Sequence, residues 1–309
     1  MKLSLFDLHA DTAWAMYQSK ETLTSNSLAV SLDKAQKYER YIQTMALWTS
    51  PKLSNEDGYT ELLNIVENLK GDVALQNGTA ELWTSCPPRD SRKTSLIFSV
   101  EDARVLDGHI DRVEVLANLG VKSVIPMWCG ETCIGGSHDT SLGLTEFGKR
   151  AAKEMLDAGM VLDISHASEE ASKEIFDFSA AHGKPVIASH SNAHVICPVS
   201  RNLRDWQIDA IVASGGIIGI NLYKAFLETD GNATLDSIQR HIEHFLSRGA
   251  QHALALGCDM DGADLPDDIP NLSHLDRLAE HLLAKGYPQE LIDNLFFENA
   301  YRFAEKHFR

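Results

Sequence analysis

Short runs of apolar residues recur along the chain, separated by longer stretches in which apolar residues return every three or four positions. Eight of the short runs are rich in Val, Ile, Leu or Ala and have the length of buried strands. The pattern therefore predicts eight strands joined by helical segments. The runs cover residues 2–8, 41–48, 94–100, 121–127, 159–165, 184–190, 215–221 and 252–258.

Three of the intervening segments carry helix signals at both ends. Each begins near a Ser or Thr, which is a preferred N-cap residue, and each ends at a glycine, which is preferred just after the last helical turn. Between these signals the apolar residues recur at helical spacing. The predicted helices lie within residues 144–159, 168–183 and 234–249.

The alternation of strands and helices predicts a parallel sheet, and eight such units in 309 residues predict a closed barrel. We therefore assign the α/β class, with a single TIM-type (β/α)8 barrel as one domain over residues 1–309. Residues 49–93 are irregular and contain one predicted helix. No Gly-x-Gly-x-x-Gly motif follows a strand, so the sequence does not support a dinucleotide-binding fold.

The first apolar run, in the sequence LSLFDLHADT, ends in an imidazole and a carboxylate. Residues two apart in an extended chain point to the same side, so His9 and Asp11 would converge where the strand ends. Imidazole and carboxylate groups suit a divalent metal such as zinc. The alternative for this pair alone is a strand that ends in ordinary polar turn residues.

Similar side chains follow several of the other predicted strands, and active sites of barrel enzymes collect at the carboxyl ends of the strands. Each residue alone has a structural alternative as a hydrogen-bonded histidine, a turn aspartate or a helix cap. If there were no metal site, all of these alternatives would have to be true at once, at the same end of the same barrel. We therefore expect a metal site there. The candidates are His9, Asp11, Glu101, His166, His190 and Asp259.

The net charge narrows the range of partners. Asp and Glu number 44 against 28 Lys and Arg, which gives a formal net charge of -16. Such a surface repels a phosphate backbone, so nucleic acid is not an expected partner. The sequence shows no secretory signal and no bilayer-spanning run, so no membrane partner is expected. The five cysteines fit reduced thiols, and we expect a cytoplasmic location.

Six motifs resemble those of the membrane dipeptidase (renal dipeptidase) family. They read DLHADT, SVEDA, GLTEFGKRAAKEMLDAGMVLDISHAS, PVIASHSNAH, SRNLRDWQIDAIVASGGIIGIN and CDMDG. The resemblance runs from His9 to about Asn299, and it rests on the order and spacing of the motifs taken together. That family belongs to the amidohydrolase-like metal enzymes, which have a (β/α)8 barrel. Since no secretory signal or lipid-anchor tail is seen, the chain resembles the soluble, bacterial-type members.

The resemblance implies a binuclear zinc site. His9 and Asp11 would hold one zinc ion, and His166 and His190 would hold the second. Glu101 would bridge both ions. The site would thus contain two Zn²⁺ ions as cofactors.

The resemblance also implies roles for residues around the metals. Arg201, in SRNLRD, resembles the arginine that binds the terminal carboxylate of the substrate. Asp259 resembles the acid that transfers protons, with Asp261 as the alternative. The renal enzyme has a histidine that helps to polarise the scissile carbonyl, and Trp128 occupies the matching position here. We expect Trp128 to contact substrate, since it keeps an indole N–H.

These residues predict a zinc dipeptidase that hydrolyses free dipeptides through a hydroxide shared by two metal ions. The alternatives are another amidohydrolase, acting on N-acyl amino acids or lactams, and a non-catalytic metal-binding barrel. A homodimer is expected only from the habit of the family. Two other histidines, His241 and His244, belong to an amphipathic segment, and we expect them to be solvated.

Overall fold

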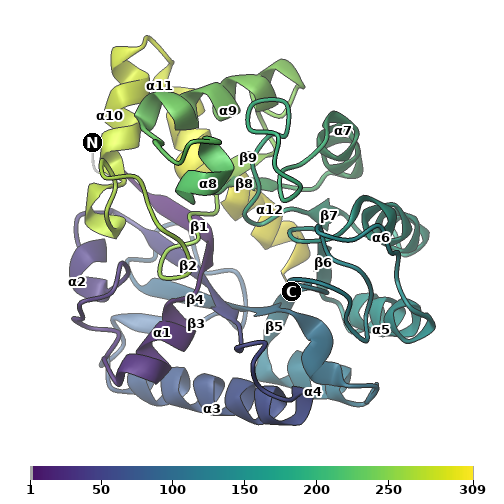
Figure 1. Cartoon of the computed structure of the whole chain (residues 1–309). Helices are drawn as coiled ribbons and strands as arrows, with labels where there is room; N and C mark the ends of the chain where they lie inside the picture. The colour runs from purple at the N-terminus through teal and green to yellow at the C-terminus, as the bar shows by residue number, and fades with distance from the viewer. Residues whose placement is uncertain (1–2, 309) are drawn as a thin grey trace.

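Parallel strands form a central barrel with helices around it (Figure 1). The computed structural model describes residues 3–308, so Lys2, which begins the first predicted run, lies outside the described residues. Every one of the eight predicted runs contains or overlaps a barrel strand, which confirms the (β/α)8 prediction. The barrel strands are β1 (Leu5–Ala10), β2 (Tyr41–Leu47), β4 (Thr94–Glu101), β5 (Val121–Ile125), β6 (Val161–Asp163), β7 (Val186–Ile187), β8 (Ile218–Ile220) and β9 (Leu254–Leu256).

The strands follow the spatial order β7-β6-β5-β4-β2-β1-β9-β8, and all the neighbouring pairs are parallel. The two ends of this order meet through a bridge between Ala188 and Ile218. At this seam the Gly219 amide donates to the Ala188 carbonyl at 2.8 Å. A Cβ on Gly219 would lie 1.9 Å from the carbonyl oxygen of Ser189, so the close approach requires glycine.

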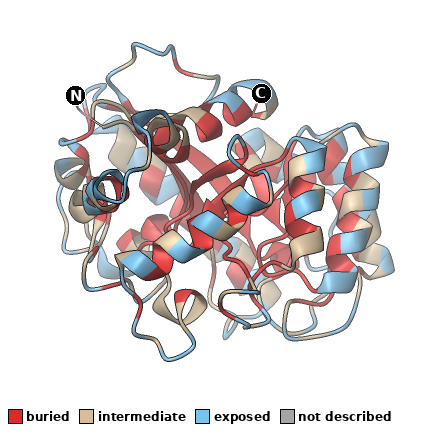
Figure 2. Cartoon of the chain, turned by 90° about the horizontal axis from the view of Figure 1, so that it is seen from above, coloured by how far each residue is buried: buried red, intermediate tan, exposed pale blue. Residues whose placement is uncertain are grey.

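The helices turn their buried faces toward the barrel and their polar faces outward (Figure 2). The three helices predicted from their end signals are present, and the side chains of Thr145 and Ser168 cap two of them by accepting hydrogen bonds from backbone amides. The helices are α1 (Thr12–Ser19), α2 (Leu32–Ala35), α3 (Asn55–Ala74), α4 (Arg112–Leu119), α5 (Glu146–Asp157), α6 (Glu169–Ala181), α7 (Asp205–Ser214), α8 (Lys224–Leu227), α9 (Leu235–Ser247), α10 (Asp276–Ala284), α11 (Gln289–Asp293) and α12 (Asn299–His307).

The irregular segment 49–93 contains the single predicted helix, which is α3. It also contains β3 (Ala80–Leu82), which the sequence did not predict. This three-residue strand pairs in parallel with β4 outside the barrel order. So short a run carries too little periodicity to be recognised, and its pairing with β4 is what makes it a strand.

The C-terminal segment closes the amino-terminal end of the barrel. The Asn299 side chain donates to the carbonyls of Gln251 and Leu254, at the start of β9. The indole of Trp83 donates to the carbonyl of Phe308. Because this end is filled, a functional site inside the barrel must lie at the carboxyl ends of the strands. The apolar cluster formed here joins Phe6, Ile42, Ile97, Val161, Ile187 and Ala255 to Phe297, Ala300, Tyr301, Phe303, Ala304 and Phe308.

The expectation that His241 is solvated is wrong, because this side chain is fully buried. Its Nδ1 accepts a hydrogen bond from the Ala193 amide, and its Nε2–H donates to the Leu227 carbonyl, both at 3.1 Å. It thereby links the loop after β7 to α8. His244, one turn further on, is partly buried and contacts Asp205. Helical spacing alone could not show that the loop after β7 covers α9.

The buried His241 predicts a dependence of stability on pH. Burial lowers the pKa of His241 from 6.5 to about 4. The unfolded chain therefore takes up a proton near pH 6.5 that the folded chain refuses until about pH 4. This linkage should remove roughly 3 kcal/mol of stability as the pH falls from 7 to 4. The free-energy gap between the native protein and His241→Asn, measured by urea unfolding, should shrink over that range.

The matched control is Ile242→Val, which changes a buried neighbour on the same helix without altering a titratable group. Its loss of stability should be the same at pH 7 and at pH 5. If the difference in unfolding free energy between the native protein and His241→Asn is also the same at pH 7 and at pH 5, the linkage is contradicted.

Candidate metal centre

The structure brings all six predicted rim residues together at the carboxyl ends of the barrel strands. His9 lies near the end of β1 and Asp11 follows it, while Glu101 is the last residue of β4. His166 and His190 follow β6 and β7, and Asp259 follows β9. His9, Glu101 and His190 are almost wholly buried. Three imidazoles and three carboxylates thus meet at the carboxyl end of the barrel, the end that the C-terminal segment leaves open.

Glu101 lies between two groups of possible metal ligands. One of its carboxylate oxygens, Oε1, lies 3.0 Å from Nε2 of His166 and 3.5 Å from Nε2 of His190. The other, Oε2, lies 3.3 Å from Nε2 of His9. The same nitrogen of His9 lies 3.6 Å from Asp11 Oδ2 and 3.9 Å from Asp259 Oδ1. The two oxygens of Glu101 therefore face different ligand groups.

Irregular backbone accompanies these positions. The pairing of β1 with β2 shifts register between Asp7 and Ala10, which places His9 at an interruption of the ladder. Such irregularities re-aim side chains beside active sites. His166 and Asp259 have left-handed backbones, with φ of 72° and 59°. Non-glycine residues pay a conformational cost for this geometry, so their surroundings must hold them in it.

Hydrogen bonds fix the orientation of two histidine rings. His166 Nδ1 lies 3.0 Å from the Trp128 carbonyl oxygen, to which it donates, and His190 Nδ1 lies 2.9 Å from Ser189 Oγ. These contacts leave both Nε2 atoms facing the cluster, 3.0 Å apart. In metal sites a ligating histidine is usually oriented in this way through its other ring nitrogen.

The charges of the cluster are mutually dependent. Burial disfavours the charged form of Glu101, but the charge of His9 and hydrogen bonds from the histidines hold its pKa well below the ordinary value. Burial and the nearby Glu101 charge raise the pKa of Asp11 well above its ordinary value. Burial also opposes a charge on His9, but Glu101 and Asp11 outweigh it and raise its pKa. The cluster therefore favours a positive charge on the His9 ring itself.

The opposite holds for the other two histidines. Burial, followed by the charge of Arg201, lowers the pKa of His166 to about 3. Burial and the charges of His9 and Arg201 lower the pKa of His190 well below its ordinary value. Both rings are therefore neutral at pH 7, which is the form that binds metal ions.

The residues present fit divalent metal ions. His9, Glu101 and His190 form one group whose ligand atoms all lie within 4.8 Å of one another, and His9, Asp11 and Asp259 form another. His9 Nε2 and Asp11 Oδ1 are buried and have no hydrogen-bond partner. Buried polar atoms without partners are costly, and a metal ion would satisfy both.

The two candidate aspartates after β9 differ sharply in their contacts. Both oxygens of Asp261 are engaged, one by the Thr12 hydroxyl and one by the Ala29 amide, each at 2.5 Å. Asp259 instead accepts from the Asn221 side chain through Oδ2 and directs Oδ1 toward His9. The geometry therefore favours Asp259 for chemistry or ligation, and Asp261 as a brace between segments.

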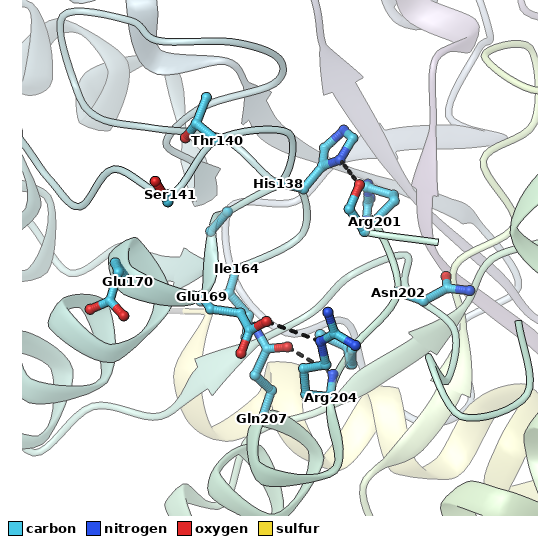
Figure 3. Close-up of a pocket in the computed structure, with 13 residues that line it drawn as sticks. His138, Thr140, Ser141, Ile164, Glu169, Glu170, Arg201, Asn202, Arg204 and Gln207 are labelled. Atoms are coloured by element: carbon cyan, nitrogen blue, oxygen red, sulfur yellow. Dashed lines mark hydrogen bonds and ion pairs between the residues drawn. The ribbon is translucent and has the colours of Figure 1, made fainter. Parts of the chain in front are cut away.

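Arg201 is buried beside the cluster and belongs to a separate cavity of about 330 Å³ (Figure 3). Its guanidinium donates to Ser191 Oγ at 2.7 Å and to the His190 carbonyl at 2.9 Å, while its Nε has no partner. Burial lowers its pKa to about 10, so it stays charged at pH 7. His138 lies next to it in the same cavity and bonds to Ser200.

Trp128 lies beside His166, one of the candidate metal ligands. Its carbonyl orients His166, and its ring lines a second cavity of about 300 Å³. Sequence reasoning missed four aromatic residues that share this cavity: Trp14, Trp48, Tyr223 and Phe226. Trp48 directly follows β2 and Tyr223 lies three residues after β8, so position after a strand was the available signal.

Buried imidazoles and carboxylates at the carboxyl rim of a barrel form a site suited to divalent metal ions that activate water. The sequence profile of the membrane dipeptidase family (peptidase family M19) matches residues 1–307, and the chain belongs to that family. The family resemblance expected from the six motifs is thereby confirmed, and membership makes the chain a peptide hydrolase of the metallopeptidase class.

The chain is also similar to individual proteins. A protein of Klebsiella pneumoniae, described as an uncharacterized protein in the pqqA 5′ region, is 35% identical over 223 residues, covering 68% of this chain and 81% of that protein. A metallopeptidase from Rhodobacter sphaeroides, crystallised with a phosphinate mimic of L-Ala-D-Ala, has the same fold, with a TM-score of 0.91 and 24% identity over 99% of this chain and 100% of that chain.

A further crystal structure, that of dipeptidase AC, is similar with a TM-score of 0.92 and 24% identity, and the match covers 100% of this chain and 99% of that one. These likenesses establish the shared barrel fold. Among residues 3–308, no helix combines the length and the apolar character that crossing a bilayer demands.

The position of Glu101 predicts its importance for metal binding. Glu101→Gln removes the charge that both ligand groups share, so the protein should lose most of its bound divalent metal after dialysis. Elemental analysis of native and variant protein gives the answer. Glu154→Gln, an exposed change on α5, serves as the control and should keep the native metal content. Full metal retention in Glu101→Gln would show that the carboxylate is not a shared ligand.

Proposed function

We propose that this chain is a dipeptidase that hydrolyses free dipeptides with the help of two zinc ions. The observation that carries the proposal is the position of Glu101, whose two oxygens face separate ligand groups beside a buried arginine. Support also comes from the R. sphaeroides fold relative, which was crystallised with a dipeptide mimic.

The ligand groups suggest how the ions would be shared. His9 and Asp11 would hold one ion, His166 and His190 the other, and Glu101 both. The set contains nitrogen and oxygen donors without thiolate, which zinc accepts readily. When bound, a pair of such ions supplies an activated water and polarises the carbonyl of the scissile bond.

Arg201 would bind the carboxylate at the C-terminus of the substrate. A guanidinium has five N–H donors, and the contacts of Arg201 to Ser191 and His190 leave others free. Because these contacts anchor it to the segment that carries a metal ligand, the distance from the carboxylate to the scissile carbonyl is fixed. A fixed distance selects a dipeptide and excludes longer chains.

Asp259 would move the proton. Its Oδ1 faces the ligand group around His9, while Asn221 holds Oδ2 and so fixes the plane of the carboxylate. From this place Asp259 would accept a proton from the attacking water and deliver it to the leaving amine. Since the group also lies within ligand distance of His9 and Asp11, a role as metal ligand is the alternative that an experiment must separate.

The first test compares Asp259→Asn with Asp261→Asn. The former keeps the size of the side chain but removes the base, so kcat should fall about 10²–10⁴-fold while the zinc content stays near that of the native enzyme. The latter should keep most activity, because Asp261 braces Thr12 and Ala29. The measurements are kcat and zinc content of both variants. A crippled Asp261→Asn beside an active Asp259→Asn would reverse the assignment, and loss of zinc from Asp259→Asn would make it a ligand.

The second test concerns Arg201. Arg201→Ala removes a charge-assisted contact to the substrate carboxylate, so KM for free dipeptides should rise roughly 10- to 100-fold with unchanged metal content. Arg204→Ala, in the same cavity but bonded to Glu169, is the matched control. The native enzyme should also cleave C-terminally amidated dipeptides and N-acyl amino acid amides poorly. Equal cleavage of free and amidated dipeptides would rule out the carboxylate contact.

A further inference from the structure

The cavity on the metal side of the site has two chemically different parts. Its apolar walls are formed by the five aromatic residues Trp14, Trp48, Trp128, Tyr223 and Phe226. Its remaining lining includes the carboxylates of Asp11, Glu101 and Asp259. The cavity holds about 300 Å³, whereas Arg201 belongs to the other, more polar cavity. The carboxylates belong to the ligand cluster, so the part of the cavity left for a substrate side chain is the aromatic part, which a bulky hydrocarbon group would match.

The tryptophan walls expose hydrocarbon and withhold their polar atoms. The indole nitrogens of Trp14 and Trp48 are buried and have no hydrogen-bond partner, so the exposed parts of these half-buried rings are carbon. Polar substrate groups would therefore find no indole N–H to bond with on these two rings. An apolar side chain would replace water against the same surface, which is favourable.

The aromatic walls are held by contacts that resist rearrangement. Trp14 packs edge-on against Trp48 at a centroid distance of 4.8 Å, and Trp48 packs against Trp128 at 5.4 Å. Tyr223, which also lines the cavity, packs edge-on against Phe226 at 4.7 Å. The cavity is therefore a preformed space lined by two aromatic groups, which binds at low entropic cost.

Arg104 fixes the segment that carries Trp48. Its guanidinium donates to the carbonyls of Thr49 and Ser50, and Asp102 pairs with it at 3.1 Å. Arg104 itself is buried, so this anchoring is not exchanged for water. Trp48 thus contacts both Trp14 and Trp128, and Arg104 fixes the backbone of the two residues that follow it.

We infer that this cavity makes the enzyme selective for dipeptides whose N-terminal residue has a large apolar or aromatic side chain. The inference rests on the proposed function. With the C-terminal carboxylate on Arg201 and the scissile bond at the ligand cluster, the N-terminal residue occupies the aromatic side. Its side chain then lies against the aromatic rings that line this cavity.

The expected preference follows from the area of side chain removed from water. A phenylalanine side chain buries far more apolar surface between these rings than the methyl of alanine, and aromatic pairs add to this. We expect kcat/KM to rise at least tenfold from Ala-Ala to Leu-Ala and Phe-Ala. In the reversed series Ala-Ala, Ala-Leu and Ala-Phe, the changing side chain lies on the polar Arg201 side, and kcat/KM should change less than threefold.

Trp48→Ala should reduce the Phe-Ala over Ala-Ala preference by at least fivefold, because it removes the central ring of the wall. Trp206→Ala is the matched control, because Trp206 is also half-buried but bonds to Glu169 and lies outside this cavity. The Phe-Ala over Ala-Ala preference of this variant should equal that of the native enzyme. A flat first series in the native enzyme, or equal preferences in the two variants, would overturn the inference while leaving dipeptidase activity intact.

A binding measurement separates this inference from the proposed function. Phenylalaninamide and alaninamide carry the ammonium and side chain of an N-terminal residue but no C-terminal carboxylate. Titration of the native, metal-loaded protein, followed by tryptophan fluorescence and calorimetry, should give at least tenfold tighter binding of phenylalaninamide, and this advantage should vanish in Trp48→Ala. Absence of dipeptide hydrolysis with this advantage intact would refute the dipeptidase assignment alone, and equal binding of the two amides would refute the aromatic selectivity.

Discussion

The burial of the Glu101 carboxylate is the constraint on which the rest of the site depends. An ionised carboxylate removed from water is unstable unless charged or hydrogen-bonding groups surround it, and here the imidazoles of His9, His166 and His190 do so from three different parts of the barrel rim. That requirement explains the register shift at His9, the left-handed backbone at His166 and the hydrogen bond from His166 to the Trp128 carbonyl. The barrel strands bring these groups together. Because the C-terminal segment fills the amino-terminal end, which is the floor of the barrel, the groups meet at the carboxyl ends of the strands.

Much of the fold could be predicted because its signals are local. The eight apolar runs and the Ser, Thr and Gly signals at helix ends each extend over only a few neighbouring residues, so they can be recognised in a single sequence. What could not be predicted depends on distant contacts. The strand β3 exists through its pairing with β4, and His241 is buried because the loop after β7 and α8 cover it. The floor formed by α12 likewise brings together side chains from almost every strand.

The same distinction applies to the site. The rim residues could be found because each lies at or shortly after the end of a predicted strand and each has the chemistry of a metal ligand, and the structure brings all six together. Choosing between Asp259 and Asp261 needed the partners of each, and Thr12 and Ala29 lie more than 230 residues away in the chain. The aromatic wall escaped notice because a tryptophan after a strand is as compatible with ordinary packing as with a substrate surface.

The floor of the barrel has a consequence for biosynthesis. Its aromatic residues Phe303 and Phe308 are synthesised long after Phe6 and Ile42 of the first strands, yet all four belong to one apolar cluster. The amino-terminal end of the barrel therefore cannot be closed until this later segment has been synthesised. The ligand cluster requires residues from β1 to the loop after β9, so it too is incomplete until β9 has been synthesised, and a metal ion can be held by the whole set of ligands only after that point.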